Sequence, residues 1–301
     1  MPLEYKPKEN LFYYSNPWVI LALVFCWIFL ALLFNHPLYV VSLFLIINIT
    51  VLASGNFRGW LYQLKFALPF VILIMLINSL FNNSGATNLL AVNLLGFCSL
   101  TINLEGLVYG LVAGIKLMAI ITGFSFYTLV IDSDQVLNLT RRLGYQISLI
   151  INMSMRLFPL VWQDYSRIRE IQRYRSLPYE NSTGLAKLKS QVPSLTILLV
   201  NSLNRSLQTA ESLYSRGYGS GPSTVYSTYK WQLTDYVLLG NIFLMAAVAL
   251  WSQFQPWSFY FYYPNLASID MASVLTALFL SIILSLPLLL NWSFKLWQRL
   301  K

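Results

Sequence analysis

Residues 106–131 read GLVYGLVAGIKLMAIITGFSFYTLVI, an apolar run interrupted by one charged residue, Lys116. A helix needs about 20 predominantly apolar residues to cross the hydrocarbon core of a bilayer, so this run predicts a membrane-spanning helix. Five further runs have the same character: Trp18–Phe34, Leu38–Ser54, Phe66–Phe81, Tyr236–Trp251 and Met271–Trp292. Together they predict an all-α membrane protein with about six transmembrane helices.

The composition agrees with a membrane protein, because 57% of the 301 residues are hydrophobic and only 10% are charged. Of the 20 basic residues, seven lie at alternate ends of the runs. These are Lys6, Lys8, Arg58, Lys65, Lys295, Arg299 and Lys301, whereas loops 35–37, 82–105 and 252–270 contain no Lys or Arg. The positive-inside rule therefore predicts a multi-pass protein of the plasma membrane with cytoplasmic termini and no nucleic-acid partner.

Three segments follow from the change in composition along the chain. Residues 1–131 are expected to form an N-terminal bundle of four spans, and residues 232–301 supply the last two. Between them, the stretch 133–231 carries 12 Lys or Arg against 5 Asp or Glu, with apolar residues at helical spacing. We expect a cytoplasmic or interfacial helical domain over 132–231.

Two long amphipathic helices are predicted in this central segment. One covers about 160–176, and Pro159 separates it from an apolar helix over 147–158. The other begins near Pro193 and runs to Arg216, where Gly217 ends it. One apolar stripe of this second helix consists of Leu199, Leu203, Leu207, Ala210 and Tyr214.

The ends of these two helices carry a repeated pattern. Glu170-Ile-Gln-Arg-Tyr-Arg-Ser and Glu211-Ser-Leu-Tyr-Ser-Arg-Gly each place a Glu five residues before an Arg that a small residue follows. A cation at a helix C-terminus is favoured by about 0.3–1 kcal/mol through the helix dipole, so either arginine alone fits a simple cap. Two equal spacings on separate helices indicate a shared function instead.

At these residues the sequence resembles the transmembrane T component of energy-coupling factor (ECF) transporters, which are vitamin and transition-metal importers. The resemblance rests on Arg156-Leu157-Phe158-Pro159, Tyr174-Arg175-Ser176 and Ser215-Arg216-Gly217-Tyr218, and it extends upstream to about Leu100. Tyr174 and Ser215 stand where the family usually has alanine. Ser176 stands where it has glycine.

The resemblance implies two ABC-type ATPase subunits and a membrane-embedded substrate-binding S component as partners, in addition to membrane lipids. Arg175 would engage one ATPase and Arg216 the other, with Tyr174, Ser176, Ser215 and Gly217 beside them. Arg156 and Pro159 would have structural roles in the coupling domain, and Leu199, Leu203 and Leu207 would contact the S component. ATP and Mg would belong to the ATPases, leaving this chain without a cofactor.

The residues favour a non-catalytic subunit. His36 is the only histidine, so neither a metal site nor a histidine-dependent catalytic group is expected. Lys116 should pack against a carbonyl or a polar side chain such as Asn78 or Asn152, because an ionisable residue within a span normally needs a partner. Two other functions stand as alternatives to a T component: a conventional ABC permease subunit and a membrane-bound enzyme of lipid or isoprenoid metabolism.

Overall fold

The structure is a computed structural model that describes residues 10–55, 57–81, 87–94, 98–132, 145–174, 185–221, 231–264, 267–268 and 270–299. The chain divides into two compact units, one formed by residues 1–136 with 229–301 and the other by residues 137–228. The first and third segments expected from the sequence therefore share one unit. The second unit lies within the segment expected to be a separate helical domain.

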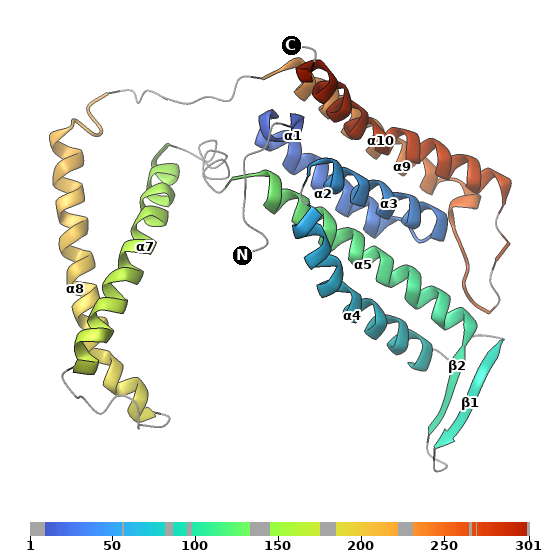
Figure 1. The fold of residues 1–301 in the computed structure, drawn as a ribbon, viewed down its shortest axis with the longest axis horizontal. Coiled ribbons are helices and arrows are strands. Elements are labelled where there is room, and N and C mark those ends of the chain that lie inside the picture. The colour runs from blue at the N-terminus through green and yellow to red at the C-terminus, as the bar shows by residue number, and fades with distance from the viewer. Residues whose placement is uncertain are drawn as a thin grey trace. The chain divides into compact units, whose positions relative to one another are not determined.

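Six apolar helices run side by side in the first unit (Figure 1). They are α2 (Pro17–Leu33), α3 (Pro37–Ala53), α4 (Phe57–Phe81), α5 (Leu104–Val130), α9 (Leu233–Gln253) and α10 (Met271–Arg299). Four contain an apolar stretch long enough to cross a membrane, and α2 and α3 are shorter apolar helices of 17 residues. The predicted all-α membrane fold is confirmed.

The short helices α2 and α3 begin at proline residues preceded by side-chain caps. Pro17 follows Asn16, whose Oδ1 accepts a hydrogen bond from the Trp18 N–H at 3.1 Å. Pro37 follows His36, whose Nδ1 accepts from the Leu38 N–H at 3.3 Å. Proline is suited to the first helical position because it lacks an N–H that would have no intrahelical partner there, so these starts are encoded locally.

Helix α5 lies at the centre of the unit and packs against α2, α3 and α4. Gly106, Gly110 and Gly114 form a stripe at four-residue spacing on the side of α5 that faces α4. A Cβ at Gly110 would lie only 2.7 Å from the Cα of Met75, which is closer than real Cβ contacts. Small residues at this spacing let two membrane helices approach to backbone contact.

A β-hairpin joins α4 to α5, a feature that the hydropathy pattern did not reveal. Strand β1 (Asn88–Leu94) pairs antiparallel with β2 (Cys98–Asn103), and β2 leads directly into α5. Glu105, at the start of α5, accepts hydrogen bonds from the N–H and hydroxyl of Thr87 at 3.2 and 2.7 Å. These bonds fix the base of the hairpin to the helix.

The second unit contains α7 (Tyr145–Tyr174) and α8 (Leu185–Ser215), which pack against each other. Pro159 lies inside α7, so the predicted break between an apolar helix and an amphipathic one is wrong. Pro193 likewise lies inside α8, which begins eight residues earlier than predicted. Proline removes one backbone hydrogen bond, but a long helix with a packed face retains enough of the others to continue through it.

Candidate functional site

The C-terminal end of α8 is a well-defined helix stop that presents Arg216. The Tyr218 N–H donates to the Leu213 carbonyl and the Gly217 N–H to the Tyr214 carbonyl, each at 3.0 Å. Gly217 has φ +75°, a left-handed conformation that glycine adopts without steric cost. This paired hydrogen-bond pattern makes Arg216 the residue that caps the helix. The predicted end of the helix at this arginine is confirmed.

The surroundings of Arg216 leave its guanidinium available. Arg216 is exposed, and the part of the chain that the structure describes offers its side chain no ion-pair partner. Ser215, the last residue of α8, turns its hydroxyl back to the Ser212 carbonyl at 2.9 Å. Glu211 is also exposed, so the repeated Glu-to-Arg spacing does not reflect an ion pair within this helix end.

The corresponding end of α7 is described as far as Tyr174. This residue ends the helix and is 81% exposed, so its ring projects from the unit at the position where the family has a small residue. Arg175 and Ser176 lie outside the described residues. The predicted role of the first arginine therefore rests on its sequence position, one residue beyond the end of α7.

One ion pair joins α7 to α8. An Nη of Arg205 lies 2.9 Å from an Oδ of Asp164, and the two side chains are 33% and 26% exposed. Sequence reasoning missed both residues, because neither belongs to an obvious motif and they are 41 positions apart. The pair links one position of α8 to one position of α7.

The predicted leucine stripe of α8 faces away from α7. Leu199, Leu203 and Leu207 are 61%, 57% and 63% exposed, whereas Ser194 is 2% exposed. The helix therefore packs through a partly polar face and presents leucines outward. Such an arrangement leaves a contiguous apolar surface that can meet a partner or lipid.

Arg156 and Pro159 are exposed on α7, and no buried structural role is visible for either. Pro159 lines an open groove of about 440 Å³ together with Phe158, Trp162 and Gln163. Phe158 and Trp162 are 69% and 62% exposed. Two residues of the Arg-Leu-Phe-Pro stretch, Phe158 and Pro159, thus line an apolar hollow on the surface of the second unit.

Lys116 has a side-chain partner, but this partner is neither Asn78 nor Asn152, the two asparagines suggested by the sequence. Its Nζ donates to the Oδ1 of Asn35 at 2.7 Å, whereas the Asn78 amide donates to Ile74 in its own helix. Asn35 also accepts a hydrogen bond at its backbone oxygen from the Tyr262 hydroxyl at 2.7 Å. Lys116 therefore belongs to a polar junction at the turn between α2 and α3.

The loop between α9 and α10 adds its aromatic residues to this junction. Tyr262 is buried and its ring lies 5.2 Å from that of Tyr109 in α5. Phe259 and Phe261 are exposed, so the side chains of this segment alternate between the interior and the surface. Burial beside Tyr260 and Tyr109 raises the pKa of Tyr262, which keeps its hydroxyl protonated as the donor to Asn35.

The fold and these helix ends together define a multi-pass membrane protein with a separate helical unit inserted before its last two apolar helices. A family model described as CbiQ, cobalt transport protein, matches residues 9–226. The chain therefore belongs to the CbiQ family. The match covers both predicted arginine-ended helices.

Curated relatives give a concordant result, and all three described next are named energy-coupling factor transporter transmembrane protein EcfT. The protein of Lactococcus lactis subsp. cremoris (strain MG1363) is 32% identical over 111 residues, which are 36% of this chain and 42% of that relative. The protein of Staphylococcus aureus (strain 04-02981) is 23% identical over 257 residues, 81% of this chain and 93% of the relative. That of Bacillus selenitireducens is 24% identical over 262 residues, with 83% and 96% covered.

These findings confirm the resemblance to the T component family that the sequence indicated. They agree with a multi-pass membrane location and with a transport function. Members of this class act as transmembrane components of a transporter complex.

Proposed function

We propose that this chain is the transmembrane coupling subunit of an ECF-type ABC importer. It transmits the ATP-driven movement of two ATPase subunits to a separate S component, which binds a vitamin or a transition-metal ion. ATP and Mg belong to the ATPase chains, so this subunit performs no catalysis. Both termini and the 137–228 unit face the cytoplasm, in keeping with the basic residues at that side.

The observation that carries this proposal is the exposed arginine at the end of α8. A guanidinium offers five donors in a fixed fork and binds carboxylates in bidentate geometry, which suits insertion into an acidic groove. Arg216 has no ion-pair partner among the described residues, and Gly217 leaves room for close approach of another chain. Arg175 takes the equivalent role beyond the end of α7.

Movement of the helix ends needs a rigid element to pass it on. Helix α8 has 31 residues and therefore extends about 46 Å at 1.5 Å per residue. The Asp164–Arg205 pair links it to α7, so displacement at Arg216 is shared by both helices. The outward leucines Leu199, Leu203 and Leu207 then provide the surface that contacts the S component.

Co-purification tests the proposal directly. The tagged full chain should retain two ATPase subunits, and Arg216→Glu should reduce retention at least about 30-fold, since losing one partner of a buried charge pair costs 2 kcal/mol or more. Arg175→Glu should have a similar effect. Arg167→Glu, an exposed arginine of α7 outside both motifs, is the matched control and should retain both ATPases.

Two results would contradict the coupling function. Unchanged ATPase retention in the Arg175→Glu, Arg216→Glu double variant would remove the role of both arginines. Stoichiometric ATP binding by the isolated chain would place nucleotide chemistry in this subunit instead of its partners.

A further inference from the structure

The short helix α1 (Leu11–Tyr14) and the residues beside it lie where α3 ends and α9 begins. Residues 10–16, the N-terminal clasp, form hydrogen bonds with four other helices: α3, α5, α9 and α10. Asn10, Ser15 and Asn16 are only 4%, 3% and 6% exposed, so their polar groups need partners in the protein. Their bonds therefore help to hold this end of the first unit together.

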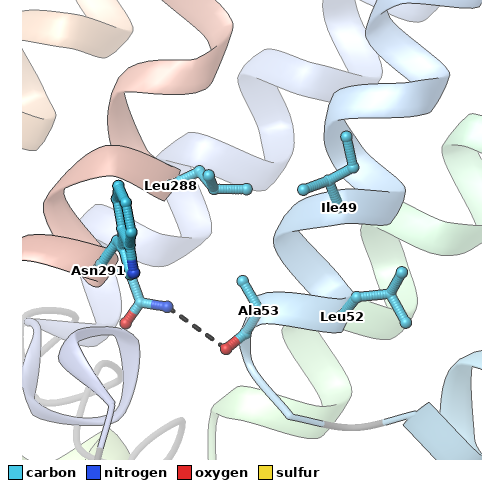
Figure 2. A pocket seen from close by; sticks show the side chains of 6 residues that line it. Ile49, Leu52, Ala53, Leu288 and Asn291 are labelled. Atoms are coloured by element: carbon cyan, nitrogen blue, oxygen red, sulfur yellow. Dashed lines mark hydrogen bonds between the residues drawn. The ribbon is translucent and has the colours of Figure 1, made fainter. Parts of the chain in front are cut away.

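The clasp joins the end of α3 to α10. The Nδ2 of Asn10 donates to the Ser54 carbonyl at 2.8 Å. The Leu11 N–H donates to the Oδ1 of Asn291 at 3.3 Å. Asn291 is 1% exposed and also donates to the Ala53 carbonyl at 3.5 Å, a bond that Figure 2 shows. The last carbonyls of a helix lack intrahelical donors, and these two asparagines supply donors at the end of α3.

The same segment joins α5 to α9. The Tyr13 hydroxyl donates to the Leu129 carbonyl, in the last turn of α5, at 3.2 Å. The Asn16 N–H donates to one carboxylate oxygen of Asp235, in the first turn of α9, at 3.0 Å. Asp235 is 0% exposed, and its other oxygen accepts from the Gln232 N–H at 3.0 Å. One buried carboxylate thus binds the starts of both α2 and α9.

Both chain connections to the second unit therefore begin beside the clasp. Leu129 precedes the second unit, residues 137–228, and Asp235 follows it, each by fewer than ten residues. The ring of Phe12 is 1% exposed and lies edge-to-face on that of Phe126, 5.2 Å away, which adds an apolar contact between the clasp and α5. Helices α3 and α10 have no direct chain connection to the second unit, but the clasp binds them as well.

We propose that the N-terminal clasp is a joint that receives movement of the second unit through α5 and α9 and passes it to α3 and α10. This role rests on the coupling function proposed for the chain. Four bonds on one seven-residue segment open together more readily than separately, because freeing one residue exposes its neighbours to water. The ends of the four helices then move as one body while the clasp is closed.

Hydrogen exchange at single amides of the full chain in detergent tests whether the clasp opens as a unit. Tyr13→Phe keeps the ring and removes the hydroxyl that donates to Leu129. It should increase exchange at the Leu11 and Asn16 amides about two- to tenfold, as for loss of one neutral hydrogen bond, although both amides donate elsewhere. Tyr14→Phe is the matched control, because Tyr14 is 53% exposed and its hydroxyl has no hydrogen bond among the described residues.

A second variant acts at the α9 side of the clasp. Asp235→Asn replaces one acceptor oxygen by a donor, so either the Asn16 or the Gln232 N–H loses its partner. Exchange at that amide should increase at least about tenfold, because hydrogen bonds to charged groups are the stronger ones. Exchange at Leu11 should increase with it if the clasp opens as a unit.

The chain assembled with its two ATPase subunits tests transmission. Exchange at the Ser54 amide, which donates to Thr50 within α3, is compared with and without a non-hydrolysable ATP analogue. The nucleotide-dependent difference should be at least about twofold smaller in Tyr13→Phe than in the wild type, and undiminished in Tyr14→Phe. A residue that only stabilises the fold would lower the melting temperature without changing this difference.

Unchanged exchange at Leu11 and Asn16 in Tyr13→Phe would overturn the clasp as a cooperative unit. Transmission through it would be overturned by a nucleotide-dependent difference at Ser54 that is equal in Tyr13→Phe and the wild type. A wild-type difference of zero with both ATPases retained would have the same consequence. Failure of the wild-type chain to retain the ATPases would refute the coupling function itself, on which exchange in the isolated chain does not depend.

Discussion

The glycine stripe of α5 leads to a sharp prediction about helix packing. Replacing Gly110 by alanine would place a Cβ 2.7 Å from the Cα and 3.2 Å from the carbonyl oxygen of Met75. The obstacle is backbone, so α4 and α5 must separate to admit the methyl group. Gly123→Ala in the same helix is the matched control, because no heavy atom lies within 4 Å of its Cβ position.

The two substitutions share one favourable effect and differ in one unfavourable effect. Alanine is favoured over glycine inside a helix by about 1 kcal/mol, and both variants gain this. Forcing an extra methyl group into a packed contact costs about 1–3 kcal/mol, and only Gly110→Ala has this cost. Gly110→Ala should therefore be less stable than Gly123→Ala by about 1–3 kcal/mol, which corresponds to several degrees in melting temperature.

The assay follows unfolding of the full chain in detergent through the thiol of Cys26, which is buried in α2. Equal melting temperatures for Gly110→Ala and Gly123→Ala would refute close α4–α5 contact. A double substitution tests the cause further. At Gly114 the nearest obstacle is Cγ1 of Val71 at 2.5 Å, so Val71→Ala should partly rescue Gly114→Ala.

Three further predictions concern other parts of the chain. Gly217→Ala should increase amide exchange at Tyr218 about 5- to 30-fold, because a left-handed conformation costs a non-glycine residue about 1–2 kcal/mol. The control Gly221→Ala should leave amide exchange at Tyr218 unchanged. A double-mutant cycle of Asp164→Asn and Arg205→Met should give a coupling of about 0.2–1 kcal/mol in thermal unfolding, as for other partly exposed ion pairs, and it should weaken with salt. Burial lowers the pKa of His36 below 6.5, so the melting temperature of the protein should fall as the pH decreases from about 7 toward 5. The variant His36→Gln should lose this pH dependence.

The sign of the His36 prediction follows from its surroundings. Its Nδ1 accepts a hydrogen bond from the Leu38 N–H, and a protonated imidazole loses that acceptor. Burial disfavours the charged form, while Asp270 opposes this with a weaker attraction. The folded protein therefore binds fewer protons than the unfolded chain near pH 6, so stability increases with pH in that range. A melting temperature independent of pH would contradict this assignment.

The membrane helices could be predicted from sequence because apolar runs of this length have few other stable environments. Their starts were also encoded, as at Pro17 and Pro37. Pro159 and Pro193 suggested helix starts on the same grounds as Pro17 and Pro37, but they lie inside α7 and α8. Proline is favoured at a first helical position and only disfavoured inside a helix, so packing of α7 on α8 can override it.

The contacts between helices could not be predicted in the same way. The spacing of Gly106, Gly110 and Gly114 is visible in the sequence, but it does not say which helix will pack there. The Asp164–Arg205 pair depends on the register of α7 against α8, which no local pattern records. A partner for Lys116 was expected, whereas its identity as Asn35 depends on the path of the turn after α2.

The two faces of α8 connect its packing to the proposed function. Ser194 and Arg205 lie on the face toward α7, while Leu199, Leu203 and Leu207 lie on the exposed face. Fully burying a leucine side chain is worth about 1.5–3 kcal/mol, and these three are about three fifths exposed, so covering them would add roughly 3–5 kcal/mol to the isolated unit. Helix α8, which packs through a partly polar face, is therefore stabilised further when an apolar partner covers the leucines. A partner covering this face would be displaced with α8 whenever its arginine-bearing end moves.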